Sequence, residues 1–214
     1  ELIARTVASV DKAIAGLYPP GSIFKMISLL AALETTSVRP TQQYYCSGVI
    51  HHGARHTPYR CWQRSGHGTL DMYGGIAQSC DVYFYKLVLD AGTSSDSIAR
   101  YARAFGLGEP TGIELPGEQA GLVPDRRWKE DADLPPAEGN VWTTGNTLHL
   151  IIGQGYLTVT PLQMAVVTAA VANGGILLRP HIVHEIRWPD HMGREPTVTQ
   201  PQVVRHVGVH PKNL

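Results

Sequence analysis

Ser22 and Lys25 have the residue types and the spacing of a serine nucleophile and its base. A serine hydroxyl is a weak nucleophile unless a base lies within hydrogen-bonding reach, and a buried lysine can be that base because burial disfavours its charged form. Residues three apart lie on the same face of a helix. On its own, however, the pattern more often indicates a serine that caps a helix and a solvated lysine.

The neighbouring residues predict a tight turn followed by a buried helix. Pro19, Pro20 and Gly21 cannot continue a regular element, so they mark a turn. The run over 23–33 is apolar on most faces, which is typical of a helix enclosed in a core, and it ends near Glu34. The first turn of such a helix offers unpaired N–H groups and a positive dipole end that stabilise a developing anion.

Helices and short strands are expected to follow one another without regular alternation, which favours an α+β fold over a wound parallel sheet. The helix from Thr160 to Ala172 is the clearest, because a capping box with proline at the first helical position opens it. Other helices are expected over 71–78, 82–90, from Ser94 or Ser95, and over 146–152. Extended segments are expected over 2–10, 44–46, 112–117 and 176–187, with a hairpin over 47–60 and a turn over 66–69.

Length and composition exclude several classes of protein. The 214 residues suffice for one domain with a real core, and Lys+Arg and Asp+Glu both number 18. A formal charge of zero gives no support for a nucleic-acid binder. No apolar run is long enough to cross a membrane, and no signal-peptide pattern opens the sequence. Three cysteines are an odd number, which does not suggest a disulfide framework.

Several separated segments together resemble the transpeptidase domain of class B penicillin-binding proteins, most closely the penicillin-binding protein 2 group. In the family's order, these segments are residues 16–25, 61–62, 66–68, 77–85, 111–118 and 152–163. The resemblance implies the α+β fold shared by penicillin-binding proteins and β-lactamases, with helices on both sides of an antiparallel sheet that this chain leaves incomplete.

The resemblance also implies roles for matching residues. Ser22 would be the acylated nucleophile, and Lys25 would take its proton. Ser79, the serine of the family's second motif, would relay a proton towards the leaving group. Asp81 occupies the position in this motif where most relatives carry asparagine.

The family's third motif, Lys-Thr-Gly or Lys-Ser-Gly, does not occur in the sequence. In the family it follows the Gly-Gln-Gly segment, binds the substrate carboxylate and supplies part of the oxyanion hole. We therefore expect residues 1–214 to be a partial transpeptidase domain without full activity. The membrane anchor, the N-terminal pedestal and the C-terminal strand would lie outside it, and an omitted loop near Asp11 would explain why residues 1–12 match the family poorly.

Cys46, Cys61 and Cys80 fall close together in the sequence, with His67 between them. Three thiolates and one imidazole are a suitable tetrahedral set for structural zinc. From chemistry alone, the three cysteines are equally consistent with zinc binding, with a Cys46–Cys61 disulfide that leaves Cys80 free, and with three separate buried thiols. The resemblance favours zinc, because members of the group carry metal ligands at matching positions. The nearby histidines 51, 52 and 56 are interpreted as solvated side chains of the hairpin.

The implied activity is a two-step acyl transfer that cross-links peptidoglycan stem peptides through Ser22, with β-lactams as inhibitors. The implied location is the periplasmic face of the bacterial inner membrane, and the implied partners are proteins of the elongation complex. Two alternatives remain. One is a hydrolase, either a D,D-carboxypeptidase or a β-lactamase, and the other is a zinc-stabilised, non-catalytic scaffold for cell-wall assembly.

Overall fold

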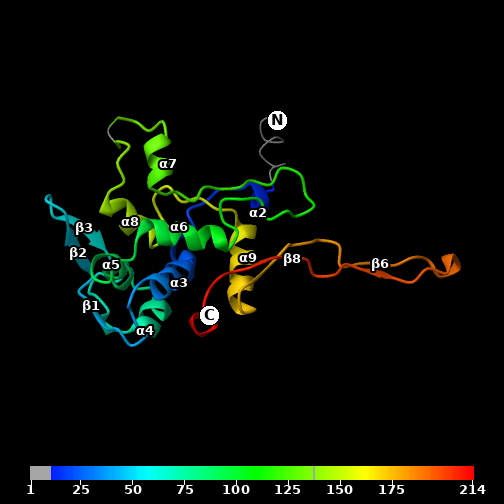
Figure 1. Cartoon of the computed structure of the whole chain (residues 1–214), viewed down its shortest axis with the longest axis horizontal. Coiled ribbons are helices and arrows are strands. Elements are labelled where there is room, and N and C mark those ends of the chain that lie inside the picture. Colours follow the sequence, from blue (N-terminus) through cyan, green and yellow to red (C-terminus); the bar gives the residue numbers. More distant parts are fainter. Residues whose placement is uncertain (1–10, 137) are drawn as a thin grey trace.

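In the computed structural model, which describes residues 11–136 and 138–214, the apolar run behind Ser22 forms the central helix of the core. A short 3-10 helix, η1 (Gly21–Phe24), leads directly into α3 (Lys25–Thr35). Phe24, Ile27 and Ala31 are fully buried, and α3 packs against α5 (Asp81–Leu89) and α6 (Ser95–Ala104). The predicted turn and buried helix are therefore both present (Figure 1).

Helices and short strands are mixed along the rest of the chain, and the α+β class is confirmed. The other helices are α2 (Lys12–Ala15), α4 (Met72–Ala77), α7 (Arg126–Asp131), α8 (Thr144–Leu150) and α9 (Pro161–Ala172), with 3-10 turns at Asp190–Met192 and Pro211–Asn213. The strands are β1 (Tyr44–Cys46), β2 (Val49–His52), β3 (Thr57–Arg60), β4 (Gly68–Leu70), β5 (Ile176–Leu178), β6 (Glu185–Ile186), β7 (Thr197–Val198) and β8 (Val203–His206).

The strands of the described residues pair as four small antiparallel sheets: β1 with β4, β2 with β3, β5 with β8, and β6 with β7. The β2–β3 hairpin projects from one end of the molecule, and the arm that carries β6 and β7 extends from the other end (Figure 1). The expected sheet is thus represented in this chain only by two-stranded pieces. The β1–β4, β2–β3 and β5–β8 pieces contact helices, whereas β6 and β7 pair with each other in the projecting arm.

Three expectations differ from the structure or lie outside it. The turn expected over 66–69 contains the start of β4, because these residues pair with β1. The extended piece expected over 112–117 is a loop, and the Glu118 carboxylate accepts the backbone N–H groups of Thr111 and Gly112 that a strand partner would otherwise satisfy. The strand expected over 2–10 lies outside the described residues.

No helix among residues 11–136 and 138–214 combines the length and apolarity needed to cross a lipid bilayer.

The predicted capping box of α9 is present and is buried. Thr160 Oγ1 accepts the N–H of Gln163, and Gln163 Oε1 accepts the N–H of Thr160. The amide nitrogen of Gln163 also donates to the backbone carbonyls of Glu109 and Ala120, at 2.9 and 2.8 Å. One glutamine therefore begins α9 and also attaches the 109–120 loop to it.

We predict that Gln163→Leu lowers the free energy of unfolding by about 3 kcal/mol, because it leaves several buried backbone groups without hydrogen-bond partners. Urea unfolding followed by tryptophan fluorescence measures the change. The control is Gln43→Leu, an exposed glutamine, which should change stability by less than about 0.5 kcal/mol. Equal effects in the two variants would contradict this role of Gln163.

Candidate functional site

The turn before α3 places Ser22 at the surface and Lys25 in the interior. Ser22 is exposed, whereas Lys25 is 0% exposed. Lys25 Nζ lies 3.3 Å from Ser22 Oγ and 5.2 Å from the centre of the Phe84 ring. Ser22, the predicted nucleophile, is therefore in contact with Lys25, its predicted base, and Lys25 is shielded from water.

The second motif lies between α4 and α5 and faces the same lysine. Ser79 Oγ donates to Ser22 Oγ at 2.7 Å. Lys25 Nζ donates to the carbonyl oxygen of Ser79 at 2.9 Å and contacts Ser79 Oγ at 3.0 Å. The two serines and the lysine thus form a connected network through which a proton can pass.

Ser79 reaches this position through an unusual backbone. Its φ is +50°, in the left-handed region that side chains other than glycine seldom occupy. Helix α4 stabilises this turn, because the N–H of Ser79 donates to the carbonyl of Ile76 and the N–H of Cys80 donates to that of Gly75. Strained conformations of this kind cluster at functional sites, where the surrounding fold maintains them.

Asp81 connects Lys25 to the loop after β3. Its Oδ1 lies 2.6 Å from Lys25 Nζ, and its Oδ2 accepts the backbone N–H of Trp62 at 3.1 Å. The indole N–H of Trp62 donates to the carbonyl of Gln78 at 3.0 Å. Both carboxylate oxygens of Asp81 are therefore used, one for the buried cation and one for the loop that precedes β4.

The Gly-Gln-Gly segment supports the turn that carries Ser22. The N–H of Gly21 donates to the carbonyl of Gly153 at 2.8 Å, and the hydroxyl of Ser28 donates to the carbonyl of Ile151 at 2.7 Å. Gly153 has φ +72°, and a Cβ added there would lie 2.2 Å from the carbonyl oxygen of Gly21. Only glycine fits this contact. The Gly-Gln-Gly segment, one of those that resemble the family, therefore fixes the turn that carries Ser22.

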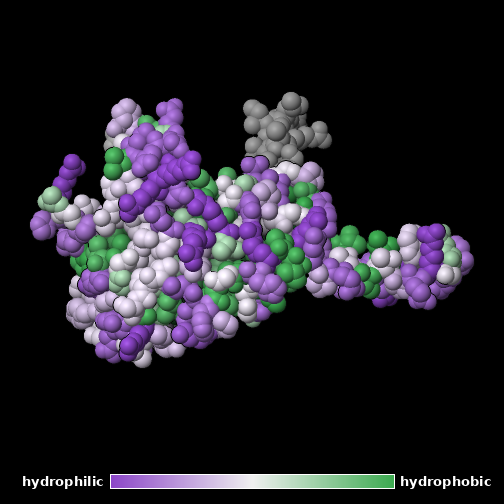
Figure 2. Space-filling model, viewed as in Figure 1, coloured by the Kyte–Doolittle hydropathy of each residue, from purple (hydrophilic) through white to green (hydrophobic). Residues whose placement is uncertain are grey.

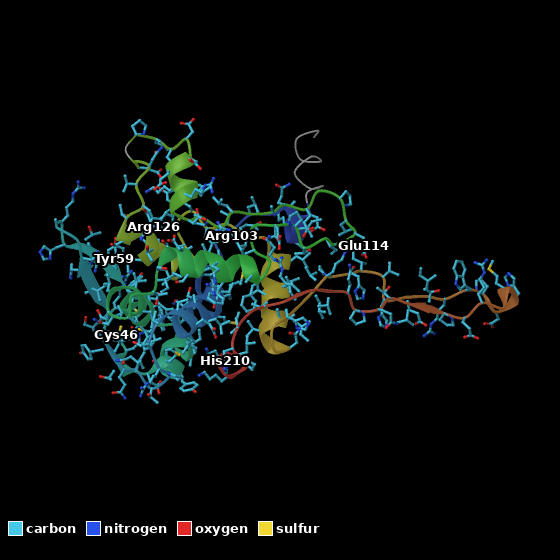
Figure 3. The ribbon with its side chains drawn as sticks, viewed as in Figure 1. Cys46, Tyr59, Arg103, Glu114, Arg126 and His210 are labelled. Carbon is cyan, nitrogen blue, oxygen red and sulfur yellow. The ribbon has the colours of Figure 1, made fainter. Side chains whose placement is uncertain are left out.

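The three cysteines and His67 meet beside the second motif. The ligand atoms of Cys46, Cys61, His67 and Cys80 all lie within 4.8 Å of one another. Nδ1 of His67 lies 3.7 Å from Cys46 Sγ and 3.5 Å from Cys61 Sγ, and the Sγ atoms of Cys61 and Cys80 are 4.0 Å apart. The three cysteines are free and buried; Cys46, on β1, is labelled in Figure 3.

These distances fit a tetrahedral metal site. With a zinc–sulfur bond of about 2.3 Å, the ligand atoms of a tetrahedron lie about 3.8 Å apart, close to the spacings found here. Burial raises the pKa of the Cys80 thiol, so in the absence of a cation this thiol keeps its proton. The four residues come from β1, from the residue after β3, from the loop before β4 and from the residue before α5.

Sequence reasoning identified the eight polar residues that the structure brings together here. It did not identify the contacts of the Trp62 backbone with Asp81, or of Gly153 with Gly21. The only signal for Gly153 was its place in the Gly-Gln-Gly segment, and for Trp62 its position directly after Cys61.

Comparison with known proteins gives a consistent result. The family described as penicillin binding protein transpeptidase domain matches residues 5–213. The peptidoglycan D,D-transpeptidase MrdA of Acinetobacter baumannii is 36% identical over 173 residues, which cover 81% of this chain and 25% of that protein. The chain therefore spans about a quarter of the length of the curated relatives it matches.

Two solved structures are also similar. Penicillin-binding protein 2 of Helicobacter pylori in complex with MreC aligns with a TM-score of 0.72 and 36% identity, covering 80% of this chain and 31% of that one. Penicillin-binding protein 2 of Pseudomonas aeruginosa in complex with WCK 5153 aligns with a TM-score of 0.78 and 34% identity, covering 95% and 43%.

We predict that Gly153→Ala slows the acylation of Ser22 by a penicillin about tenfold or more, because the new Cβ displaces the turn that carries the hydroxyl. The rate of covalent labelling by a fluorescent penicillin measures this effect. Gly92→Ala is the control, since Gly92 has a similar φ of +78° but nothing within 4 Å of an added Cβ. An equal loss in both variants would show that backbone strain, rather than contact with Gly21, is responsible.

Proposed function

Because the chain belongs to the penicillin-binding protein transpeptidase domain family, we propose that its Ser22 site cross-links the stem peptides of peptidoglycan by D,D-transpeptidation. The observation that carries the proposal is the buried Lys25 in contact with both Ser22 and Ser79. A lysine enclosed in this way can accept the proton of a hydroxyl at 3.3 Å.

In the first step, Ser22 Oγ attacks the carbonyl carbon of the D-Ala-D-Ala bond, and its proton passes to the amine of Lys25, which becomes an ammonium group beside Asp81. Ser22 lies in the first turn of η1, where its backbone N–H has no intrahelical acceptor and is free to stabilise the developing oxyanion. The C–N bond then breaks, and the leaving D-Ala amine takes a proton through Ser79. The products are free D-Ala and an ester between Ser22 and the remaining stem.

In the second step, an amine of a neighbouring stem attacks this ester. The proton that the amine loses returns through the same network to Ser22 Oγ, the C–O bond breaks, and an amide cross-link forms. A β-lactam takes the place of the D-Ala-D-Ala unit in the first step and leaves Ser22 acylated. Asp81 maintains the position of Lys25 throughout, because its Oδ1 lies 2.6 Å from Lys25 Nζ.

We further propose that the four clustered ligands, Cys46, Cys61, His67 and Cys80, hold a structural zinc ion. When bound, the ion would connect β1 and the loop between β3 and β4 to the start of α5, and so fix Ser79 and Asp81 relative to Ser22. Four protein ligands complete a tetrahedron, so such an ion would have no open position for substrate.

By the same reasoning, we propose that the enzyme acts in the cell envelope, at the periplasmic face of the inner membrane. The support is the family's chemistry and the complex of a relative with MreC. Proteins of the elongation complex are the proposed partners. Fractionation of cells that produce the protein tests the location, and recovery only in the cytosol would contradict it.

We predict that incubation with a β-lactam increases the intact mass of the denatured protein by one ligand, and that Ser22→Ala abolishes the adduct. Lys25→Met should slow its formation by about a factor of 1,000, since it removes the general base. The control is Lys86→Met, a partly exposed lysine paired with Asp90. Normal labelling of the Lys25 variant would exclude Lys25 as the base, and absence of any adduct would favour the non-catalytic scaffold.

If labelling succeeds, an amine acceptor distinguishes the remaining activities. A transpeptidase gives cross-linked dimers from stem peptides, whereas a carboxypeptidase or β-lactamase gives only hydrolysis products.

We predict one zinc ion per purified chain, lost in Cys46→Ser and retained in His51→Ala, as measured by elemental analysis. Because burial raises the pKa of the Cys80 thiol, a proton has to leave before the metal binds, and zinc affinity should fall as the pH is lowered. After chelation and denaturation, three free thiols are expected. A single free thiol would instead indicate a Cys46–Cys61 disulfide.

A further inference from the structure

The segment that precedes the second motif has a strongly uneven charge. Over the whole chain Lys+Arg equals Asp+Glu, but no aspartate or glutamate occurs between Glu34 and Asp71. The same segment contains Arg39, Arg55, Arg60 and Arg64, together with four histidines. This segment includes strands β1 to β4 and lies at one end of the molecule (Figure 1). We call it the basic lobe. The neutral total charge of the chain conceals it.

The arginines of this lobe are exposed and available to a ligand. All four are solvent-exposed, and among the described residues none of their guanidinium groups lies within 4.0 Å of a carboxylate. Several arginines elsewhere are paired, as in the ion pairs of Arg103 with Asp125 and of Arg187 with Glu185. Among the described residues, these four arginines therefore form no ion pair with the protein's own carboxylates.

The register of the β2–β3 hairpin directs one basic face away from the molecule. Tyr59 packs edge-on against Tyr85, with ring centres 5.7 Å apart, so its face of the hairpin points to α5. Because side chains alternate along a strand, Arg60 and its diagonal neighbour His51 lie on the opposite, outer face. Arg55 and His56 occupy the exposed tip, which is mostly hydrophilic in Figure 2.

The outer face continues to the candidate active site. Arg60 is followed by Cys61 and Trp62, and the backbone of Trp62 contacts Asp81. Trp62 is 61% exposed although its indole N–H is hydrogen-bonded, and Tyr45 on β1 is 64% exposed. The basic lobe therefore begins next to the residues that contact Lys25 and extends outward from them.

We propose that the part of this lobe that carries Arg55, Arg60, Arg64 and the hairpin histidines binds carboxylate-rich peptidoglycan and delivers its stems to Ser22. The inference rests on the proposed function, because every stem that ends in D-Ala-D-Ala carries a terminal carboxylate, and a strand with many such stems is a polyanion. Opposite charge attracts a polymer of this kind and increases its local concentration at the site. A membrane surface fits less well, because the tip at 53–57 lacks the large apolar side chains that insert into lipid.

Co-sedimentation with purified peptidoglycan sacculi tests the proposal. The protein should pellet with sacculi, and raising the salt concentration from 50 to 500 mM should release it, a range of about tenfold in ionic strength over which exposed charges become screened. The triple variant R55Q/R60Q/R64Q should bind about tenfold more weakly, since each exposed ion pair contributes only a few-fold to binding. The control is R126Q/R127Q/R194Q, which removes three exposed arginines elsewhere and should bind normally.

Two further measurements distinguish a failure of the proposed function from a failure of the proposed binding surface. Labelling of Ser22 by fluorescent penicillin should be unchanged in both triple variants, since a β-lactam is small and does not need the lobe. If the wild-type protein is not labelled, the proposed function alone is contradicted. If both triple variants sediment equally with sacculi, the proposal that the basic lobe binds peptidoglycan is overturned. Binding of the wild type to phosphatidylglycerol vesicles but not to sacculi would also overturn it, in favour of a lipid surface.

Discussion

The contact on which the site depends is that of the buried Lys25 with three oxygen-bearing residues. A cation removed from water is costly unless other groups replace its hydration, and here Ser22, Ser79 and Asp81 surround it within 2.6–3.3 Å. The contacts with Ser79 and Asp81 join segments more than fifty residues apart in the sequence. The need to solvate one ammonium group thus determines how α3, the α4–α5 junction and the loop at Trp62 come together.

These segments support one another from two sides. On one side, the Gly-Gln-Gly segment hydrogen-bonds to the turn before Ser22, where only glycine can approach so closely. On the other side, Cys80 and Asp81 are consecutive, so a group that fixes the thiol also fixes the carboxylate that contacts Lys25. The cysteine and histidine cluster is therefore connected to Ser22 through Asp81 and Lys25.

Local patterns predicted much of this arrangement, and non-local contacts explain what they missed. Ser22 and Lys25 are three residues apart, and α9 begins with a capping box, so both could be inferred from neighbouring residues. The pairing of β4 with β1 and the closure of the 112–117 loop by Glu118 depend on distant partners, and no local pattern predicts them. The zinc site stays a prediction. Equal totals of positive and negative residues concealed the basic lobe, because a net charge contains no information about where charges lie.

The left-handed backbone at Ser79 restricts how the site can evolve. Asparagine and glycine are the residues that tolerate φ near +50° best, but neither has the hydroxyl that contacts Ser22. Threonine keeps a hydroxyl but is β-branched, which makes this conformation more costly. Few single substitutions at this position therefore preserve both the backbone conformation and the hydroxyl contact with Ser22. Under the proposed function, resistance to β-lactams would therefore arise more readily at other residues near Ser22 than at Ser79.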